Sequence, residues 1–262
     1  MLLLLLLQVL ASCLWLGHSE VVPSFESCPQ FFFQGTPPND VLNPNNPAWI
    51  CQHYNSEYHF ATLYNRDLRI PVYSAYIYEP GPGPRPHISM IEPQVSVLSY
   101  RTSPSKEIKK SQAVSEDYTN LNGMHAGRLN PSAHQANDIR KEAAFTLTNT
   151  VPQNAKLNVG HWRNYEQNTM ANKNNGCITT YVVVGTVPGN SYIARGRVNK
   201  PSYLWSSACC EMGNNQMKAW AVIAGNENNA LESLRLGDLE DRLTELYGMG
   251  KVSLFHGDCP RQ

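Results

Sequence analysis

The stretch from residue 118 to 170 constrains the fold more than any other part of the chain. It contains three blocks of mixed apolar and polar residues, which read GMHAGRLNP at 123–131, AFTLTNTVPQ at 144–153 and LNVGHWRNYE at 157–166. In the last block Asn158, Trp162 and Glu166 recur at intervals of four, so a helix would place all three near the same face. The spacing predicts a polar site in which Asn158 and Glu166 share one helix.

These blocks, in this order and at this spacing, resemble those of the DNA/RNA non-specific endonucleases of the ββα-metal class. Members of that family show Asp-Arg-Gly-His-Leu-x-Pro, then Phe-x-Leu-Thr-Asn-x-x-Pro-Gln, then Leu-Asn-x-Gly-x-Trp followed by a Glu. The resemblance is strongest to their secreted, endonuclease domain-containing 1 branch, and it extends over most of residues 58–256. It implies an α+β fold with a central, mainly antiparallel sheet flanked by helices, rich in loops and cross-linked by disulfides.

The resemblance also implies the chemistry of the site. In the family a His ends the first strand of the motif and takes a proton from water, and the helix Asn, which matches Asn158, holds a Mg²⁺ (or Mn²⁺) ion. The family's Glu matches Glu166, which we expect to hold a water molecule on the metal. The partner would be DNA or RNA of any sequence, and Arg140, Lys141 and Arg163 are the cations expected to line its groove.

The sequence departs from the family at the catalytic position itself. Aligning Gly-x-Leu-x-Pro places Arg128 where the family has its His, while His125 and Ala126 replace the family's Asp and Arg. A guanidinium stays protonated at physiological pH, so Arg128 cannot act as a general base. Loss of a general base typically lowers the rate by ~10²–10⁴, and a fixed positive charge beside the metal position disfavours Mg²⁺. We therefore expect weak or absent hydrolysis, with Arg128 in a salt bridge or in contact with phosphate.

Three histidines are candidates for a displaced base. His125 comes three residues before Arg128, and on an extended strand these two side chains point to opposite faces, so a direct replacement needs a bent backbone. His134 is expected in the loop that follows, where a surface histidine is the simpler interpretation. His161 comes one turn after Asn158 and is the more plausible of these last two, although an ordinary histidine on a helix surface would give the same pattern.

The N-terminus has the pattern of a secretory signal. Residues 1–16 are almost wholly apolar, and Gly17 and Ser19 stand at the −3 and −1 positions of a cleavage site before Glu20. An uncleaved membrane anchor is the alternative, but the run is shorter than the ~20 apolar residues that span a bilayer. We expect a signal peptide at 1–19, an irregular lead-in at 20–57, an endonuclease-like domain at 58–262, and an extracellular protein without a membrane segment after cleavage.

Six cysteines remain once Cys13 has left with the signal peptide. An even number in a secreted chain predicts up to three disulfides, but the sequence does not select among the many possible pairings. Cys209 and Cys210 are adjacent, and a bridge between neighbours is strained, so we expect each to take a different partner. The spacings contain no C-x-x-C pair and fit a zinc site poorly. The six are Cys28, Cys51, Cys177, Cys209, Cys210 and Cys259.

Alternating and apolar runs predict the main strands and one helix. Strands are expected at 58–64 and 70–78, joined by a turn, and shorter buried strands at 181–184 and 220–224. Leucines spaced by three and four from Leu236 to Leu246 predict an amphipathic helix that closes the domain. No internal repeat or linker is evident, so a single α+β domain is the simplest interpretation.

The net charge of the chain discriminates only weakly between the possible functions. The 21 Lys and Arg residues balance 21 Asp and Glu residues, which excludes a polybasic nucleic-acid tail. The favoured function is a nucleic-acid and divalent-metal binding scaffold with reduced hydrolysis, which the retained Asn158 and Glu166 support. An active Mg²⁺-dependent endonuclease with a displaced histidine is one alternative. A secreted module that binds an unknown protein on a vestigial nuclease fold is the other, and the neutral net charge favours it slightly.

Overall fold

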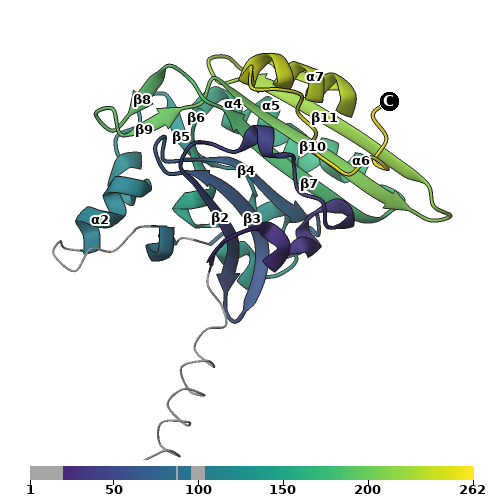
Figure 1. The fold of residues 1–262 in the computed structure, drawn as a ribbon, viewed down its shortest axis with the longest axis horizontal. Helices are drawn as coiled ribbons and strands as arrows, with labels where there is room; N and C mark the ends of the chain where they lie inside the picture. Colours follow the sequence, from purple (N-terminus) through teal and green to yellow (C-terminus); the bar gives the residue numbers. More distant parts are fainter. Residues whose placement is uncertain (1–19, 87, 96–103) are drawn as a thin grey trace, which may run out of the picture.

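One antiparallel sheet organises most of the chain (Figure 1). The computed structural model describes residues 20–86, 88–95 and 104–262, so the predicted signal peptide at 1–19, with Cys13, lies outside the described residues. The sheet has the order β1-β2-β3-β4-β7-β10-β11-β12, and every neighbouring pair is antiparallel. Its strands are β1 (Val21–Val22), β2 (Pro47–Tyr54), β3 (Glu57–Asn65), β4 (Ile70–Ile77), β7 (Cys177–Val187), β10 (Tyr203–Met212), β11 (Met217–Gly225) and β12 (Leu231–Leu234). The predicted α+β class with a mainly antiparallel sheet is confirmed.

The predicted strands correspond to β3, β4, β7 and β11, although the prediction extends one residue beyond the end of β4, and the predicted helix is α7 (Leu236–Tyr247). The segment 20–57 differs from the irregular lead-in that its Pro and Asn content predicts. It begins with short 3₁₀ turns, but it also supplies β1 and the eight-residue β2, which pairs along its length with β3. Apolar residues of this segment, among them Ile50 and Phe33, are buried, so it is an integral part of the sheet and its core.

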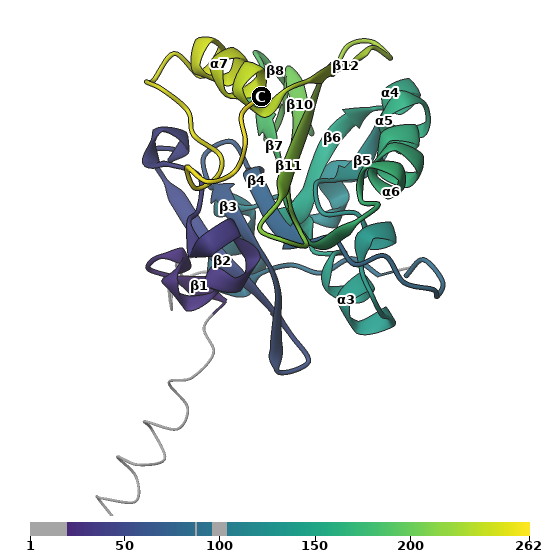
Figure 2. The same ribbon diagram turned by 90° about the vertical axis from the view of Figure 1, so that its right-hand side faces the viewer.

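The two faces of the sheet are covered by different layers, because side chains alternate along each strand. On one face α7 packs its leucines, including Leu239, into a core that contains Trp205 and Cys209 of β10. On the other face a second core contains Cys210 of β10 and Trp162. Figure 2 shows α7 on one side of the central strands and the group α4, α5 and α6 on the other. The helices of this second layer are α3 (Asp138–Ala143), α4 (Ala155–Val159), α5 (His161–Asn164) and α6 (Met170–Lys173).

Three disulfides cross-link the sheet and the segments that flank it. Cys28 is bonded to Cys51, Cys177 to Cys210, and Cys209 to Cys259. The prediction that the two adjacent cysteines take different partners is confirmed. Because the adjacent residues of β10 point to opposite faces, one bridge holds the start of β7 on the α6 side and the other holds the C-terminal tail on the α7 side.

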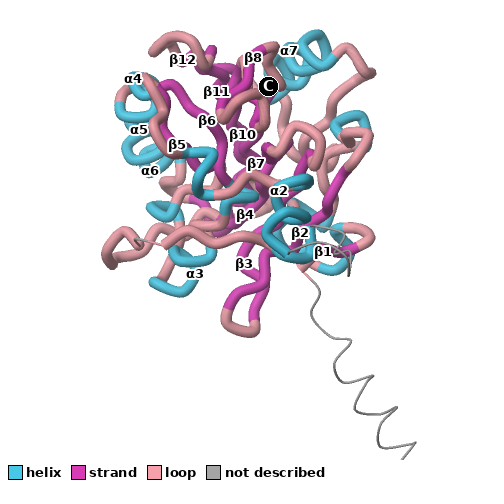
Figure 3. Tube along the Cα trace, turned by 90° about the vertical axis from the view of Figure 1, so that its left-hand side faces the viewer, coloured by secondary structure: helices cyan, strands magenta, loops and turns pink. Residues whose placement is uncertain are grey.

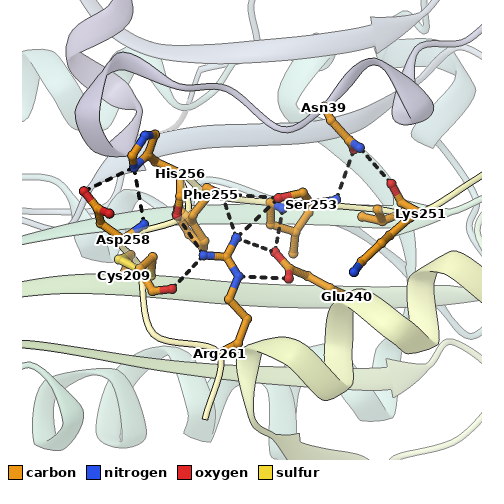
Figure 4. A network of polar contacts seen from close by, with 12 residues as sticks. Asn39, Cys209, Glu240, Lys251, Ser253, Phe255, His256, Asp258 and Arg261 are labelled. Atoms are coloured by element: carbon orange, nitrogen blue, oxygen red, sulfur yellow. Dashed lines mark hydrogen bonds and ion pairs between the residues drawn. A yellow bond between two sulfur atoms is a disulfide. The ribbon is translucent and has the colours of Figure 1, made fainter.

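The C-terminal tail is further fixed by one arginine (Figure 4). Arg261 donates to both carboxylate oxygens of Glu240 on α7, each at 3.1 Å, and Glu240 is buried. The same guanidinium donates to the backbone carbonyls of Phe255, His256 and Cys259 at 2.6–2.7 Å. This network anchors the tail to α7 independently of the disulfide.

Smaller elements lie at the periphery. They are the helix α2 (Pro104–Ser111) and the hairpin of β8 (Ser191–Ile193) and β9 (Val198–Lys200). Arg197 joins the hairpin to α2, because it donates from Nη1 to Lys109 O at 2.7 Å, and it also donates from Nε to Asp117 Oδ1 at 2.8 Å. Within the described parts of the chain, no helix combines the length and the apolarity needed to cross a membrane.

Candidate functional site

The first two sequence blocks form a small sheet of their own. β5 (Met124–Arg128) pairs antiparallel with β6 (Thr150–Asn154), and α4 follows directly, which gives the expected ββα arrangement. Gly127 packs so closely on Gln153 that a Cβ at position 127 would lie 2.2 Å from Gln153 Oε1. Asn154 ends β6 and caps the helix, since its Oδ1 accepts from the backbone N–H groups of Lys156 at 2.9 Å and Leu157 at 3.2 Å.

The helix predicted to carry both Asn158 and Glu166 is interrupted at Gly160, so that prediction is wrong. Gly160 has φ −102° and ψ −117°, outside the helical region, and a Cβ there would lie 2.6 Å from Lys156 O. The chain resumes as α5 and then widens into a π-helical turn at Tyr165–Thr169 before α6. Asn158 therefore lies on α4 and Glu166 on the π-helical turn.

Both segments nevertheless line one cavity of about 960 Å³, which we call the β5 cavity. Its walls come from β5, the end of α4, the π-helical turn and the loop at 81–85, and Figure 3 shows β5 beside α4 and α5. Six of the seven predicted site residues line it, and they are His125, Arg128, Lys141, Asn158, Arg163 and Glu166. The seventh, Arg140, is not among the lining residues. The sequence blocks thus converge on one concave site.

Arg128 is a fixed cation on the wall of the β5 cavity. Its guanidinium carbon lies 3.5 Å from the centroid of the Phe145 ring, and that of Arg85 lies 5.9 Å from the same centroid. Burial and the neighbouring Arg85 charge lower the pKa of Arg128 to about 10, against the opposing influence of Glu166, so the group stays protonated at neutral pH. It forms no ion pair with a carboxylate among the described residues, and its Nε is buried without a protein partner there. Of the two predicted roles, the intramolecular salt bridge is therefore absent from the described structure.

Glu166 is held by the helix that precedes it. Trp162 donates from Nε1 to Glu166 Oε1 at 2.9 Å. Burial raises the pKa of Glu166 to about 8, although the Trp162 N–H and the charges of Arg163, Arg128 and Arg85 act in the opposite direction. A carboxyl with this pKa is largely protonated at neutral pH, which makes it a weak ligand for a cation or for a metal-bound water.

His125 is the histidine that contacts the predicted metal residue. Its Nδ1 lies 3.0 Å from Nδ2 of Asn158, and the amide donates because an amide nitrogen cannot accept. His125 and Arg128 both line the cavity, and β5 pairs with β6 without a bulge. In the described structure β5 has a partner strand on one side only.

Of the other two histidines, His134 differs from its predicted surface placement, whereas His161 matches its simpler interpretation, a histidine on a helix surface. His134 is buried rather than on the surface, with Nδ1 at 2.8 Å from the Tyr76 hydroxyl and Nε2 at 2.8 Å from the backbone oxygen of Glu166. Burial lowers the pKa of His134 to about 4. His161 is exposed, does not line the β5 cavity, and donates its backbone N–H to Asn229 Oδ1 at 3.1 Å. Neither is placed to take a proton from a molecule bound in the cavity.

The cations predicted on α3 have structural partners. Lys141 is 3% exposed and donates from Nζ to the carbonyls of Gly81 at 2.9 Å and Gly83 at 3.3 Å, and also to that of Pro82. Arg140 forms an ion pair with Glu79 outside the cavity. Lys141 therefore fixes the loop at 81–85 rather than presenting a free charge.

That loop supplies the cavity residue that the sequence interpretation missed, Arg85. Its guanidinium approaches the Phe145 ring from the same cavity as Arg128. The Gly-Pro repeat before it predicts a loop, but nothing in the local sequence connects this arginine with the block at 123–131.

The β5 cavity fits a divalent cation poorly. Within the described residues, no three His, Cys, Asp or Glu side chains gather as a metal site. Asn158 contacts His125 through Nδ2, so its Oδ1 could still face a cation, but Glu166, whose pKa is raised, accepts from Trp162. Mg²⁺ prefers several hard oxygen ligands, whereas arginines in a partly buried cavity favour a phosphate or a carboxylate.

Comparison with known proteins agrees with this arrangement. The model of the family described as DNA/RNA non-specific endonuclease matches residues 37–246. The chain is 28% identical to a human endonuclease domain-containing 1 protein over 257 residues and 26% identical to the mouse protein over 253 residues. These matches cover 93% and 90% of the chain but only 49% and 48% of the relatives, so the chain spans about half the length of the curated relatives it matches.

The fold also matches a solved structure. A chain from the crystal structure of the EndoG/EndoGI complex, described as showing the mechanism of EndoG inhibition, superposes with a TM-score of 0.56. The match covers 87% of this chain and 91% of that chain at 13% identity. At this identity the likeness concerns the fold.

Proposed function

This chain belongs to the DNA/RNA non-specific endonuclease family, and from that premise we propose that it binds nucleic acid in the β5 cavity while its phosphodiester hydrolysis is weak or lost. One observation carries the proposal. At the position that the resemblance assigns to the catalytic histidine, Arg128 presents a half-buried guanidinium, 3.5 Å from the Phe145 ring centroid, to the cavity. That replacement removes a base and adds a cation, so it disfavours catalysis and favours an anionic ligand.

The loss of hydrolysis follows from proton chemistry. A general base must release its proton near the working pH, and even with its pKa lowered to about 10 Arg128 remains charged there. Its neighbour Ala126 also lacks the guanidinium that the family motif supplies at that point. We expect activity ~10²–10⁴-fold below that of a family member with the histidine.

Binding of nucleic acid is supported by the cations that line the cavity. Arg85 and Arg128 both approach the Phe145 ring, and Arg163 is exposed on α5. Arginine side chains recognise phosphate through two parallel N–H donors, and this recognition is independent of base sequence. We therefore expect binding without a divalent cation. Only residual cleavage, if it occurs, should require Mg²⁺ or Mn²⁺.

A second candidate function is an endonuclease with a displaced base, and the contact between His125 and Asn158 favours it. His125 lines the cavity and is exposed to solvent, so it has access to a water molecule beside a bound phosphate. If this candidate is correct, the purified protein cuts plasmid DNA with Mg²⁺, and a His125→Ala variant does not.

The direct test is incubation of the purified protein with plasmid DNA and with RNA in Mg²⁺, in Mn²⁺ and in chelator. We expect retarded migration in all three conditions without efficient cleavage. Efficient cleavage in Mg²⁺ would contradict the loss of hydrolysis. Absence of binding in every condition would favour the alternative of a protein-binding module on a vestigial nuclease fold.

A restoration experiment tests the role of position 128. The triple variant His125→Asp, Ala126→Arg, Arg128→His rebuilds the family motif, and we expect metal-dependent cleavage from it. Adding Asn158→Ala to this variant should abolish the recovered activity, because Asn158 is the residue that the resemblance assigns to the metal. Arg128→His alone should restore activity at most in part. Restored cleavage that survives Asn158→Ala would contradict the assignment.

The cellular setting is part of the proposal. Three disulfides suit an oxidising compartment, and the apolar N-terminal run matches a secretory signal. We propose removal of residues 1–19 and secretion, with residues 20–262 acting as one endonuclease-like unit. The mass of the secreted protein, measured before and after alkylation without reductant, should show a start at Glu20 and no free thiol.

A further inference from the structure

The β5 cavity has a second, apolar part that phosphate binding does not use. Leu121 and Met124 line it where the chain enters β5, and Val159 lines it at the end of α4. Val159 is 57% exposed at this end of the cavity. Tyr118 also lines the cavity, but its hydroxyl donates to the carbonyl of Thr150 at 3.0 Å, and Thr150 pairs with Arg128, so this ring reaches the other end of β5.

The two parts of the cavity lie at opposite ends of β5. Met124 begins the strand at the apolar part, and Arg128 ends it at the cationic part. Four residue steps along an extended strand measure ~13 Å. The cavity thus offers cations for a phosphate at one end of the strand and apolar surface for an uncharged, flat group at the other.

We propose that the β5 cavity takes a stretch of nucleic acid with an unpaired base, with phosphates on Arg85 and Arg128 and the base against Met124 and Val159. The ligand class is therefore single-stranded DNA or RNA, or a strand end, rather than intact duplex. This inference rests on the proposed function and adds to it the part of the nucleic acid that is bound.

The preference follows from where the bases are in each ligand. In a duplex the faces of the bases are stacked inside the helix, so the apolar part of the cavity can contact them only after unstacking, which lowers affinity. A single strand exposes its bases without that cost, and contact of one base with apolar side chains should raise affinity by about tenfold, at the low end of the range for bases that stack on aromatic rings. Phosphates alone favour the duplex, whose charge density is higher, so tighter binding of the single strand requires contact with its bases.

The test compares three labelled ligands with the same number of phosphates in chelator at low salt. They are a mixed-sequence single strand of DNA, a hairpin duplex, and a single strand of abasic sites. We expect the ordinary strand to bind about tenfold more tightly than the other two. If the ordinary and abasic strands bind equally, or the duplex binds as tightly as the strand, the inference is wrong while the proposed function stands. If none of the three binds, both are wrong.

Variants of the apolar part give the second measurement. Val159→Ser and Met124→Ser should each reduce affinity for the ordinary strand toward that of the abasic strand. The abasic strand should bind these variants as it binds the unaltered protein, which also shows that they fold. Ile178→Ser is the matched control, because Ile178 is 75% exposed on β7 and does not line the β5 cavity. An equal loss with Ile178→Ser, or no loss with either cavity variant, would overturn the inference.

Discussion

Replacement of Arg128 by methionine should weaken nucleic-acid binding and make it less sensitive to salt. Methionine keeps an unbranched, polarisable side chain against the Phe145 ring but removes the charge. Four Lys and Arg side chains line the β5 cavity in the described structure, and Lys141 donates to the carbonyls of the loop at 81–85. That leaves Arg85, Arg128 and Arg163 for phosphates, and the variant would have two of these three.

The expected size of the effect follows from counterion release. On a single strand each neutralised phosphate contributes about −0.7 to the slope of log K against log salt concentration, so three contacts give about −2.1 and two give about −1.4. Between 50 and 200 mM KCl the unaltered protein should lose affinity roughly 18-fold and the variant roughly 7-fold.

Fluorescence anisotropy with a labelled single strand at several KCl concentrations measures both slopes. Arg242→Met is the matched control, because Arg242 lies half-exposed on α7, which covers the opposite face of the sheet. We expect its slope to equal that of the unaltered protein. An unchanged slope in Arg128→Met would show that Arg128 does not contact phosphate, and the proposed function would lose its main support.

Three further predictions concern stability. Arg261→Ala leaves the buried Glu240 carboxylate without its charge partner and should lower the free energy of unfolding by about 3 kcal/mol in urea denaturation; adding Glu240→Gln should recover part of this loss, and no recovery would contradict the explanation. His134 has a pKa of about 4 when folded and a higher one when unfolded, so its contribution to stability is lost as the pH falls from about 6.5 toward 4. His134→Gln should show a shallower decline over that range in urea titrations at successive pH values. The pH dependence of the contribution of Glu166 to stability has the opposite sign. Its folded pKa of about 8 exceeds the unfolded value, so its contribution is lost as the pH rises through 8. Glu166→Gln, which keeps an acceptor for Trp162, should remove that loss, and an unchanged dependence between pH 6.5 and 8.5 would refute the assigned pKa.

Local sequence patterns predicted the elements in which buried residues recur at a regular spacing. The alternation at 58–64 and the leucine spacing from Leu236 to Leu246 each depend on one face of one element, so β3 and α7 were predicted. β2 was not predicted, because prolines and asparagines surround its apolar residues and its strand character depends on pairing with β3. The break at Gly160 was also missed, because a spacing of four residues does not reveal how closely another part of the chain approaches.

The sequence predicted those residues of the candidate site that belong to the motifs. Motif spacing identified Arg128, Asn158 and Glu166, and all three line one cavity. Contacts between distant segments decided the rest. Arg85 enters the cavity because Lys141 holds its loop, and Arg140 points away because Glu79 lies beside it. Such contacts leave no periodic signal in the sequence.

The adjacent cysteines of β10 also fix the alignment of the sheet. Side chains along a strand alternate with a period of two, so a slip of one residue between β10 and its neighbours would exchange the faces of Cys209 and Cys210. Each sulfur would then face the wrong layer, and neither bridge to Cys177 or Cys259 could close. Formation of both disulfides therefore requires that the strands pair in the correct register. A chain that has formed them has at the same time linked the start of β7, which follows α6, and the C-terminal tail to two neighbouring residues of one strand.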